Sequence, residues 1–222
     1  MNFFTDTNMP IGYTVIHDKW HEESVEFIET STEPIYWSNL VEEEYDEPLE
    51  DITSDLIYWL NYITEILKNN ENDFDSYYNF EKYILIKTKS INIDDTKKRK
   101  ILEKFWQKNN FNYGISTIIY SNFLKYSHDF KKIYSMRMEK LKKMLILHDC
   151  GLDNYQNYYK YATALNNASI HNPDYKIIVD AHDCGLKHGY LTFITKDGKM
   201  LDALSKINTF HLAIIEFKSY NN

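Results

Sequence analysis

Short apolar runs near both ends of the chain predict β-strands, and they alternate with segments of helical periodicity. The first run contains Phe3 and Phe4 and ends in turn-forming residues at 5–10, as a buried strand does when it enters a loop. Further strands are predicted over 34–37, 191–195 and 211–217, and helices over 19–30 and from Pro173 onward. Because strands and helices alternate at both ends, we predict an α/β fold with a mainly parallel central sheet.

The middle of the chain has the periodicity of helices. Apolar residues recur at helical spacing from Ile52 to Leu67, and the polar tract 69–75 ends that element. Helices are also predicted over 94–109, 116–147 and 153–166. Between residues 125 and 143, seven basic side chains outnumber two acidic ones. This basic helix face could bind RNA phosphates, although a solvated surface is the preferred interpretation.

The amino-acid composition excludes several classes of protein. The formal net charge is −8 at pH 7, which excludes a simple polybasic nucleic-acid binder. Hydrophobic residues make up 43% of the chain, which is enough for a packed core. The two cysteines, Cys150 and Cys184, are too few for a disulfide framework and favour a cytoplasmic location. No apolar run approaches the ~18 residues that span a bilayer, so we expect no membrane segment.

Candidate chemistry comes from acids on the apolar stripe of a helix, where an unpaired carboxylate is costly to bury. With an advance of about 100° per residue, Glu44 falls between the core positions Leu40 and Val41, whereas the acids at 42 and 43 point outward. In the helix after Pro173, the same geometry places Asp174 on the buried stripe, Asp180 at its edge and Asp183 on the far side. Glu44 and Asp174 are therefore the inward-facing acids.

Two further acids follow predicted strands. Asp6 emerges from the first strand and Asp197 from the strand over 191–195, and open parallel sheets form their ligand crevice at such strand ends. Together with Glu44 and Asp174 they have reason to converge, and four close carboxylates repel one another unless a cation neutralises them. Mg²⁺ or Mn²⁺ takes such oxygen ligands and bridges them to phosphates. Metal-assisted phosphodiester hydrolysis is the natural chemistry of this set.

The same residues carry a family resemblance. The segments that carry it are Phe4-Thr5-Asp6-Thr7-Asn8, Trp37-Ser38-Asn39-Leu40-Val41-Glu42-Glu43-Glu44, Asp174 to Ala181, and Phe193-Ile194-Thr195-Lys196-Asp197. In order and polarity this set resembles the motifs of PIN-domain nucleases. The resemblance implies a three-layer α/β/α fold and metal-dependent cleavage of single-stranded RNA that leaves 5′-phosphate and 3′-hydroxyl ends. It also implies that Asp6, Glu44, Asp174 and Asp197 bind the metal.

The resemblance covers only the two ends of the chain. We therefore expect residues 1–50 and 168–222 to form a discontinuous nuclease core, and residues 51–167 to form a mostly helical insertion or lid. Compact relatives are often dimers, so a homodimer is possible here, as is an antitoxin-like protein partner. The biological role, toxin or RNA processing, stays open because both would use one site.

Each candidate residue has a structural alternative. Asp6 could cap a turn, Asp174 could cap its helix after Pro173, and Asp197 could form a turn with Gly198. Asp180 is a further candidate metal ligand, with a supporting or surface position as the preferred alternative. Substrate or water contacts are assigned to Thr7, Asn8, Ser38 and Thr195, for which capping and turn roles are equally good explanations.

Other functions also fit parts of the sequence. A phosphatase of the haloacid dehalogenase type would use Asp6 as nucleophile, but that family needs a second Asp where this chain has Asn8. A catalytically silent RNA- or protein-binding module is the other alternative.

The sequence His-Asp-Cys-Gly-Leu occurs at 148–152 and again at 182–186. The two copies offer His148, Cys150, His182 and Cys184 as a possible zinc set. We prefer the interpretation that both repeats are helix ends stopped by Gly151 and Gly185.

Overall fold

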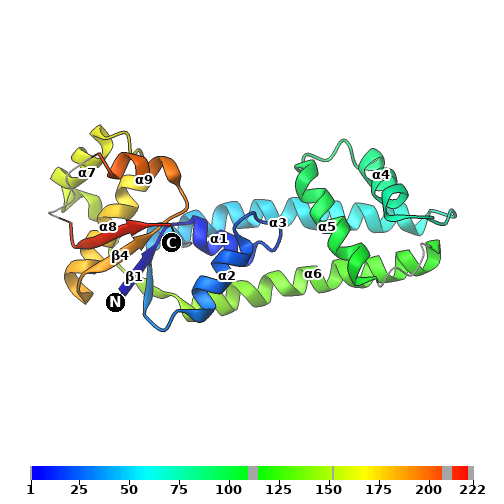
Figure 1. The fold of residues 1–222 in the computed structure, drawn as a ribbon, viewed down its shortest axis with the longest axis horizontal. Helices are drawn as coiled ribbons and strands as arrows, with labels where there is room; N and C mark the ends of the chain where they lie inside the picture. The colour runs from blue at the N-terminus through cyan, green and yellow to red at the C-terminus, as the bar shows by residue number, and fades with distance from the viewer. Residues whose placement is uncertain (1, 110–114, 152, 207–211, 220–222) are drawn as a thin grey trace. The chain divides into compact units, whose positions relative to one another are not determined.

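The computed structural model describes residues 2–109, 115–151, 153–206 and 212–219 (Figure 1). Within these ranges no helix is both long enough and apolar enough to cross a membrane. The elements are β1 (Asn2–Thr5), α1 (Asn8–Thr14), α2 (His21–Thr30), β2 (Ile35–Ser38), α3 (Asn39–Lys68), α4 (Tyr77–Lys87), α5 (Asp95–Lys108), α6 (Ser116–Met144), β3 (Ile146–His148), the 3-10 turn η1 (Asn154–Gln156), α7 (Tyr159–Asn167), α8 (Asp174–His188), β4 (Leu191–Ile194), α9 (Gly198–Leu204) and β5 (Ile214–Lys218).

The strands form one five-stranded, all-parallel sheet in the order β3-β2-β1-β4-β5. β1 lies in the middle, where Phe4 is paired with Tyr36 of β2 on one side and with Phe193 of β4 on the other. Every residue of β2 and β4 is buried, as continuous apolar runs in a parallel sheet predict. The predicted α/β class and parallel sheet are confirmed.

The strand order contains one topological switch point. From β1 the chain builds outward through β2 to β3, and it then returns to the other side of β1 with β4 and β5. In sheets of this kind ligands bind outside the carboxyl ends of the strands at the point where the order reverses. Here that point lies between β1 and β4, the strands followed by Asp6 and Asp197.

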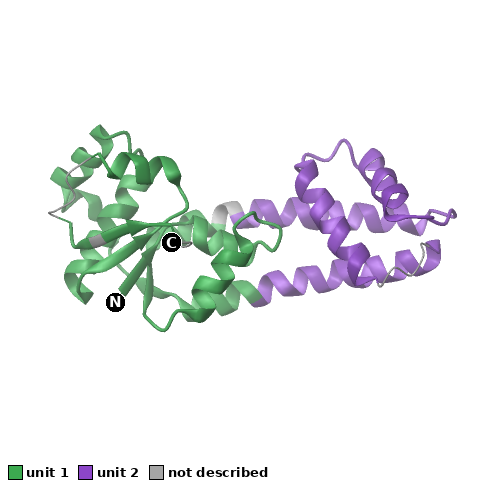
Figure 2. Ribbon diagram, in the orientation of Figure 1, with its two compact units in different colours: residues 1–48, 137–222 green, residues 49–136 purple. Residues whose placement is uncertain are grey.

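The chain divides into two compact units (Figure 2). Unit 1 consists of residues 1–48 and 137–222 and contains the sheet, whereas unit 2 consists of residues 49–136. The division differs from the expected one, because residues 137–167 were assigned to the insertion and belong to unit 1. The reason is β3, which follows α6 and pairs with β2 as an edge strand of the sheet. Both unit boundaries fall inside helices, namely α3 and α6.

Several local predictions need correction. The helix expected to run to Leu147 ends at Met144, because the apolar run that follows pairs as β3 with β2. A short apolar run can form either the end of a helix or a strand. Here a strand far away in the sequence, β2, decides the outcome by pairing with it. The helices α1, α4 and α9 were not predicted, and α1 begins at Asn8 inside the stretch expected to be a loop. The strand expected over 211–217 is β5, although residue 211 lies outside the described ranges.

Neither glycine of the repeated sequence ends a helix. Gly151 has φ +74° in a loop after β3, and Gly185 lies inside α8, which continues to His188 before Gly189 at φ +92°. An added Cβ at Gly185 would lie 2.1 Å from the Ala213 carbonyl oxygen. Gly185 is therefore needed for close packing of α8 on the segment that leads into β5.

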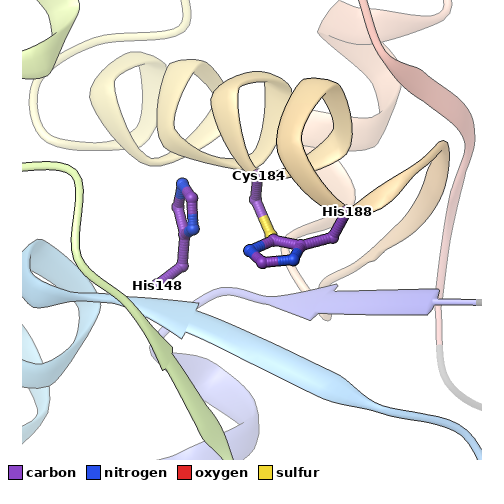
Figure 3. Close-up of side chains that lie close together, drawn as sticks. All are labelled: His148, Cys184 and His188. Atoms are coloured by element: carbon purple, nitrogen blue, oxygen red, sulfur yellow. The ribbon is translucent and has the colours of Figure 1, made fainter.

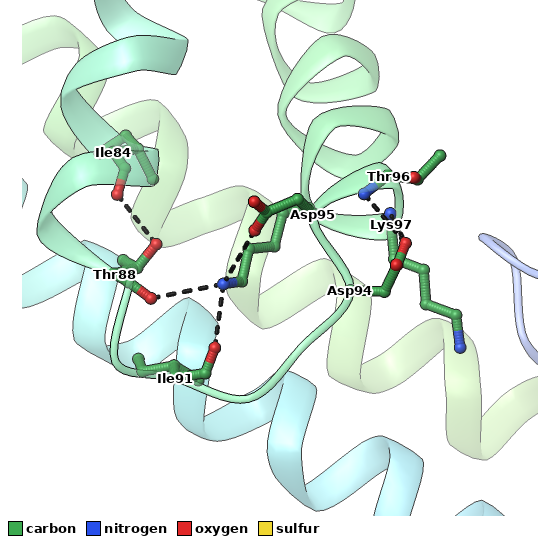
Figure 4. A network of polar contacts seen from close by, with 8 residues as sticks. Ile84, Thr88, Ile91, Asp94, Asp95, Thr96 and Lys97 are labelled. Carbon is green, nitrogen blue, oxygen red and sulfur yellow. Dashed lines mark hydrogen bonds and ion pairs between the residues drawn. The ribbon is translucent and has the colours of Figure 1, made fainter.

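Unit 2 has a core of aromatic side chains and one buried cation. Phe105 packs against Phe80 and Phe123 with ring centroids 5.6 and 4.8 Å apart. Lys98 is 2% exposed, and its Nζ donates to the Ile91 carbonyl at 2.9 Å and to the Thr88 carbonyl at 3.4 Å (Figure 4).

The surroundings of this ammonium explain why it can be buried. Asp95 contributes an ion pair at 3.4 Å, and the neighbouring Asp94 caps α5 by accepting from the backbone N–H groups of Thr96 and Lys97. Lys98 thus joins the start of α5 to the loop after α4, because buried carbonyl groups require donors.

We expect Lys98→Met to destabilise the protein. Methionine keeps the apolar stem but leaves two carbonyl acceptors without their donor, which costs about 1–3 kcal/mol in the free energy of unfolding. Urea unfolding checks this, with Lys100→Met as the matched control because Lys100 is exposed on the same helix. Equal stability of the two variants would contradict the structural role of Lys98.

Candidate functional site

Asp6 is the buried acid at the end of β1, with 3% of its surface exposed. Its carboxylate accepts hydrogen bonds from the Asn8 backbone N–H at 3.1 Å, the Asn8 side chain at 2.9 Å and the Thr195 hydroxyl at 2.5 Å. Burial, with a smaller contribution from the charge of Asp174, raises the pKa of Asp6 to about 6 despite the opposing effect of these hydrogen bonds. The expected turn role of Asp6 is thus present, within a wider network.

Thr195 connects Asp6 to Asp197. Its hydroxyl donates to Asp6 and accepts from the Asp197 backbone N–H at 2.9 Å, and Thr195 itself is fully buried. Asp197 caps α9 by accepting from the N–H groups of Lys199 and Met200 through Oδ1. The capping alternative for Asp197 is therefore present in the structure, and it uses one of the two carboxylate oxygens, Oδ1. Thr195 is placed to orient the two acids rather than to reach a substrate.

Glu44 lies in the second turn of α3 and is half-buried, as its place on the inner stripe predicts. The Thr7 hydroxyl donates to Glu44 Oε2 at 2.9 Å and so joins the loop after β1 to α3. Burial raises the pKa of Glu44, the Thr7 hydrogen bond lowers it, and the charge of Asp174 raises it. Its neighbour Glu42 is turned the other way, toward an ion pair with Lys142 at 3.0 Å.

Asp174 is the acid that couples the others. It is half-buried and is the first residue of α8, whose N-cap position is occupied by Pro173, so Asp174 does not hold the capping position expected as its alternative. Burial and the charge of Asp197 raise the pKa of Asp174, while Asp174 in turn raises the pKa of Asp6 and of Glu44. Asp174 is thus the acid whose charge acts on Asp6 and on Glu44, and it is itself influenced by the charge of Asp197.

Asp180 belongs to a different part of α8. It is buried, accepts from the Asn154 side chain at 3.1 Å and is hydrogen-bonded to Ser38 and Cys150. Burial raises its pKa despite these contacts. Ser38 is fully buried and accepts from the Val41 backbone N–H at 3.4 Å, as a residue capping α3 does. These contacts favour the supporting role for Asp180 and the capping role for Ser38.

The predicted orientation of Asp183 is wrong. Asp183 was expected on the far side of its helix, but it is 6% exposed. Its carboxylate accepts from the Tyr158 hydroxyl at 2.6 Å, from Lys187 at 2.8 Å and from His148 at 2.9 Å. Because η1 and α7 cover the side of α8 that a single-stripe analysis leaves to solvent, this helix is buried all round from 177 to 185.

The structure does not bring together the four residues that the repeated sequence suggested as zinc ligands. His182 Nδ1 accepts from the Ala213 backbone N–H at 2.8 Å, and Cys150 is engaged with Asp180. The other half of the set, His148 and Cys184, does come together, and His188 joins it. The sequence motif therefore contributed one histidine and one cysteine to a group whose third member it did not contain.

Much of the basic helix face is used inside unit 1. Arg137 donates to the Tyr13 carbonyl at 2.9 Å, Lys140 pairs with Glu29, and Lys142 pairs with both Glu42 and Asp46. These contacts favour a structural role for this part of the face over RNA binding.

Lys196 was missed by the sequence analysis, although it stands between Thr195 and Asp197. Its Nζ lies 4.6 Å from the centroid of the Trp20 ring, and burial lowers its pKa. A cation held over an aromatic ring next to an acidic site suits a phosphate group. The sequence signal that could have identified Lys196 was its position between Thr195 and Asp197.

The four acids offer the ligand chemistry, though not a close ligand group, for a hard divalent cation. Among the described residues, no three of these carboxylates bring their oxygen atoms within 4.8 Å of one another. Mg²⁺ keeps several of its waters and uses only one or two direct carboxylate ligands, so it does not need such a close group. Asp6, Glu44, Asp174 and Asp197 supply oxygen ligands alone, which Mg²⁺ and Mn²⁺ prefer.

Comparison of the chain with protein-family models, with curated proteins and with solved structures finds no match in any of the three.

The raised pKa of Asp6 predicts a pH-dependent effect on stability. Between pH 3.8 and about 6 the folded protein binds more protons at Asp6 than the unfolded chain, so the contribution of Asp6 is lost as pH rises through 6. In the presence of chelator, we expect Asp6→Asn to be more stable than the parent at pH 8 by about 1–3 kcal/mol, and this advantage to shrink at pH 5. Thermal unfolding at both pH values measures it.

Asp202→Asn is the control, because Asp202 is an exposed acid in unit 1. An advantage of Asp6→Asn that is equal at the two pH values would show that the Asp6 carboxylate is not destabilised by burial.

Proposed function

We propose that this chain is a metal-dependent endoribonuclease with a PIN-like, three-layer α/β/α fold, acting on single-stranded RNA. The observation that carries the proposal is the placement of Asp6 and Asp197 at the switch point of the sheet, where the Thr195 hydroxyl joins them. Asp174 and Glu44 are near enough that the charge of Asp174 raises the pKa of Asp6 and of Glu44. These acids come from four separate elements or strand ends, yet their charges influence one another. A folded chain that holds four interacting carboxylates needs a counter-charge, and a divalent cation supplies it.

The proposed roles follow from the contacts of each residue. Asp6, Glu44, Asp174 and Asp197 would hold Mg²⁺ or Mn²⁺, and when bound the ion activates water and stabilises the leaving oxygen. Thr195 fixes the carboxylate of Asp6 and the backbone of Asp197 in one arrangement. Thr7 holds Glu44 toward the same edge of the sheet, and Asn8 holds Asp6.

Two regions could bind the RNA itself. In unit 1, Lys196 beside Asp197 would neutralise a phosphate next to the metal site. In unit 2, a pocket of about 240 Å³ between α5 and α6 is lined by Lys108, Lys125 and Tyr126, among others. Lysines beside an aromatic ring are suited to a phosphate and an unpaired base. A homodimer and an antitoxin-like protein partner stay predictions from the resemblance alone.

Cleavage of end-labelled single-stranded RNA tests the proposal. We expect the purified protein to cleave with Mn²⁺ or Mg²⁺ and not with chelator, leaving 5′-phosphate and 3′-hydroxyl ends. Asp6→Asn and Asp174→Asn should each lower the rate by more than about 100-fold, since loss of a supporting residue alone costs about 10–100-fold. Glu43→Gln, an exposed neighbour of Glu44, should cleave like the parent.

Other outcomes would replace the proposal. RNA affinity that survives both chelation and Asp6→Asn, without cleavage, would favour the silent binding module. Hydrolysis of a small phosphate monoester with a phosphoryl group trapped on Asp6 would favour the phosphatase, which Asn8 at the second position argues against.

A further inference from the structure

Three metal-ligating side chains meet beneath the C-terminal half of α8 (Figure 3). His148 comes from the end of β3, while Cys184 and His188 come from α8, one turn apart on the same side of the helix. The two ring nitrogens and the sulfur that face one another all lie within 4.8 Å. His148 and Cys184 are buried, whereas His188 is exposed. The group is therefore closed on the protein side and open toward solvent.

This group is separate from the carboxylates. Asp174 begins α8, and Cys184 follows ten residues later, which is about 15 Å along a helix axis. The ligand chemistry also differs, because two imidazoles and a thiolate are borderline or soft donors. This group of side chains therefore differs from the carboxylates in both its position and the metals that its donor atoms favour.

His148 is oriented as a metal ligand would be. One ring nitrogen, Nε2, lies 2.9 Å from Asp183 Oδ2, and Asp183 also accepts from Tyr158 and Lys187. A carboxylate that accepts from three donors takes the imidazole N–H, which leaves the lone pair on Nδ1. Figure 3 shows the second ring nitrogen on the side of the ring that faces Cys184 and His188. A carboxylate behind a histidine is the arrangement that fixes metal-binding imidazoles.

His188 is also held in place, although it is exposed. Its ring stacks on Tyr36 with centroids 4.8 Å apart and meets the His148 ring edge to face at 5.4 Å. Its backbone carbonyl accepts from the Asn2 side chain at 2.9 Å, which ties the end of α8 to the start of β1. Zinc with nitrogen ligands at about 2.0–2.1 Å and sulfur at about 2.3 Å requires ligand atoms about 3.3–3.6 Å apart. Because the three ligand atoms lie within 4.8 Å of one another, shifts of no more than about 1.5 Å would bring them to these separations.

We propose that His148, Cys184 and His188 bind a zinc ion, with the fourth coordination position open to solvent. Two nitrogens and one thiolate form a ligand set typical of zinc, and three protein ligands with an open position are typical of zinc sites that bind water or a further ligand. A buried cysteine alone would be an ordinary core residue. The carboxylate-oriented His148 and the stacked His188 on either side of Cys184 distinguish this position.

Cobalt(II) spectroscopy of the full-length, reduced, chelator-treated protein tests the proposal. We expect Co²⁺ to give a thiolate charge-transfer absorption and the visible bands of tetrahedral cobalt, and one equivalent of Zn²⁺ to abolish both. Cys184→Ser should remove the thiolate band, while Cys150→Ser should keep it, because Cys150 lies outside the group. Asp6→Asn should also keep it, which separates this site from the carboxylates.

His188→Gln is a second variant that leaves the protein core intact, since His188 is exposed. We expect it to weaken Zn²⁺ affinity by more than about tenfold in a competition titration, because even loss of a residue behind a ligand costs about 10–100-fold. A parent protein without a thiolate band would overturn the proposal. So would a band that survives Cys184→Ser or depends on Cys150.

Discussion

The position of β1 in the middle of the parallel sheet is the constraint on which the rest of unit 1 depends. β1 is paired with β2 on one side and with β4 on the other, so its carboxyl end is surrounded by protein and Asp6 is buried there. The charge is tolerable only because Asn8 and Thr195 supply hydrogen bonds. Thr195 also accepts from the Asp197 backbone N–H, so the same contacts fix the position of Asp197, the residue that caps the start of α9.

The sequence predicted those features that depend on local pattern. Apolar runs located β1, β2 and β4, and a simple angular count placed Glu44 on the inner side of α3, where Thr7 now meets it. Features that depend on distant partners were not predictable in this way. The run that forms β3 looks like the end of a helix until β2 lies beside it, and Asp183 looks exposed until η1 and α7 cover α8.

The same division explains the candidate sites. Asp6 and Asp197 could be found because a strand end is visible in the sequence, whereas His188 became a candidate only when the fold placed it beside His148. α8 links the two proposed sites, with Asp174, a proposed oxygen ligand, in its first turn and Cys184 and His188, proposed sulfur and nitrogen ligands, toward its end. Ligands of different hardness at opposite ends of one helix would keep two metals apart.

The discontinuity of unit 1 has a consequence for biosynthesis. Asn2 of β1 pairs with Leu191 of β4, so the central strand is made long before one of its two partners. Unit 2 is one continuous stretch and is complete by residue 136, before β3, β4 and β5 have been translated. At about 5–20 residues per second, Phe3 and Phe4 wait about 10–40 s for their neighbours in β4. During that interval β1 has one unpaired edge, on the side that β4 will cover, and exposed apolar strand edges of this kind are what chaperones protect from aggregation.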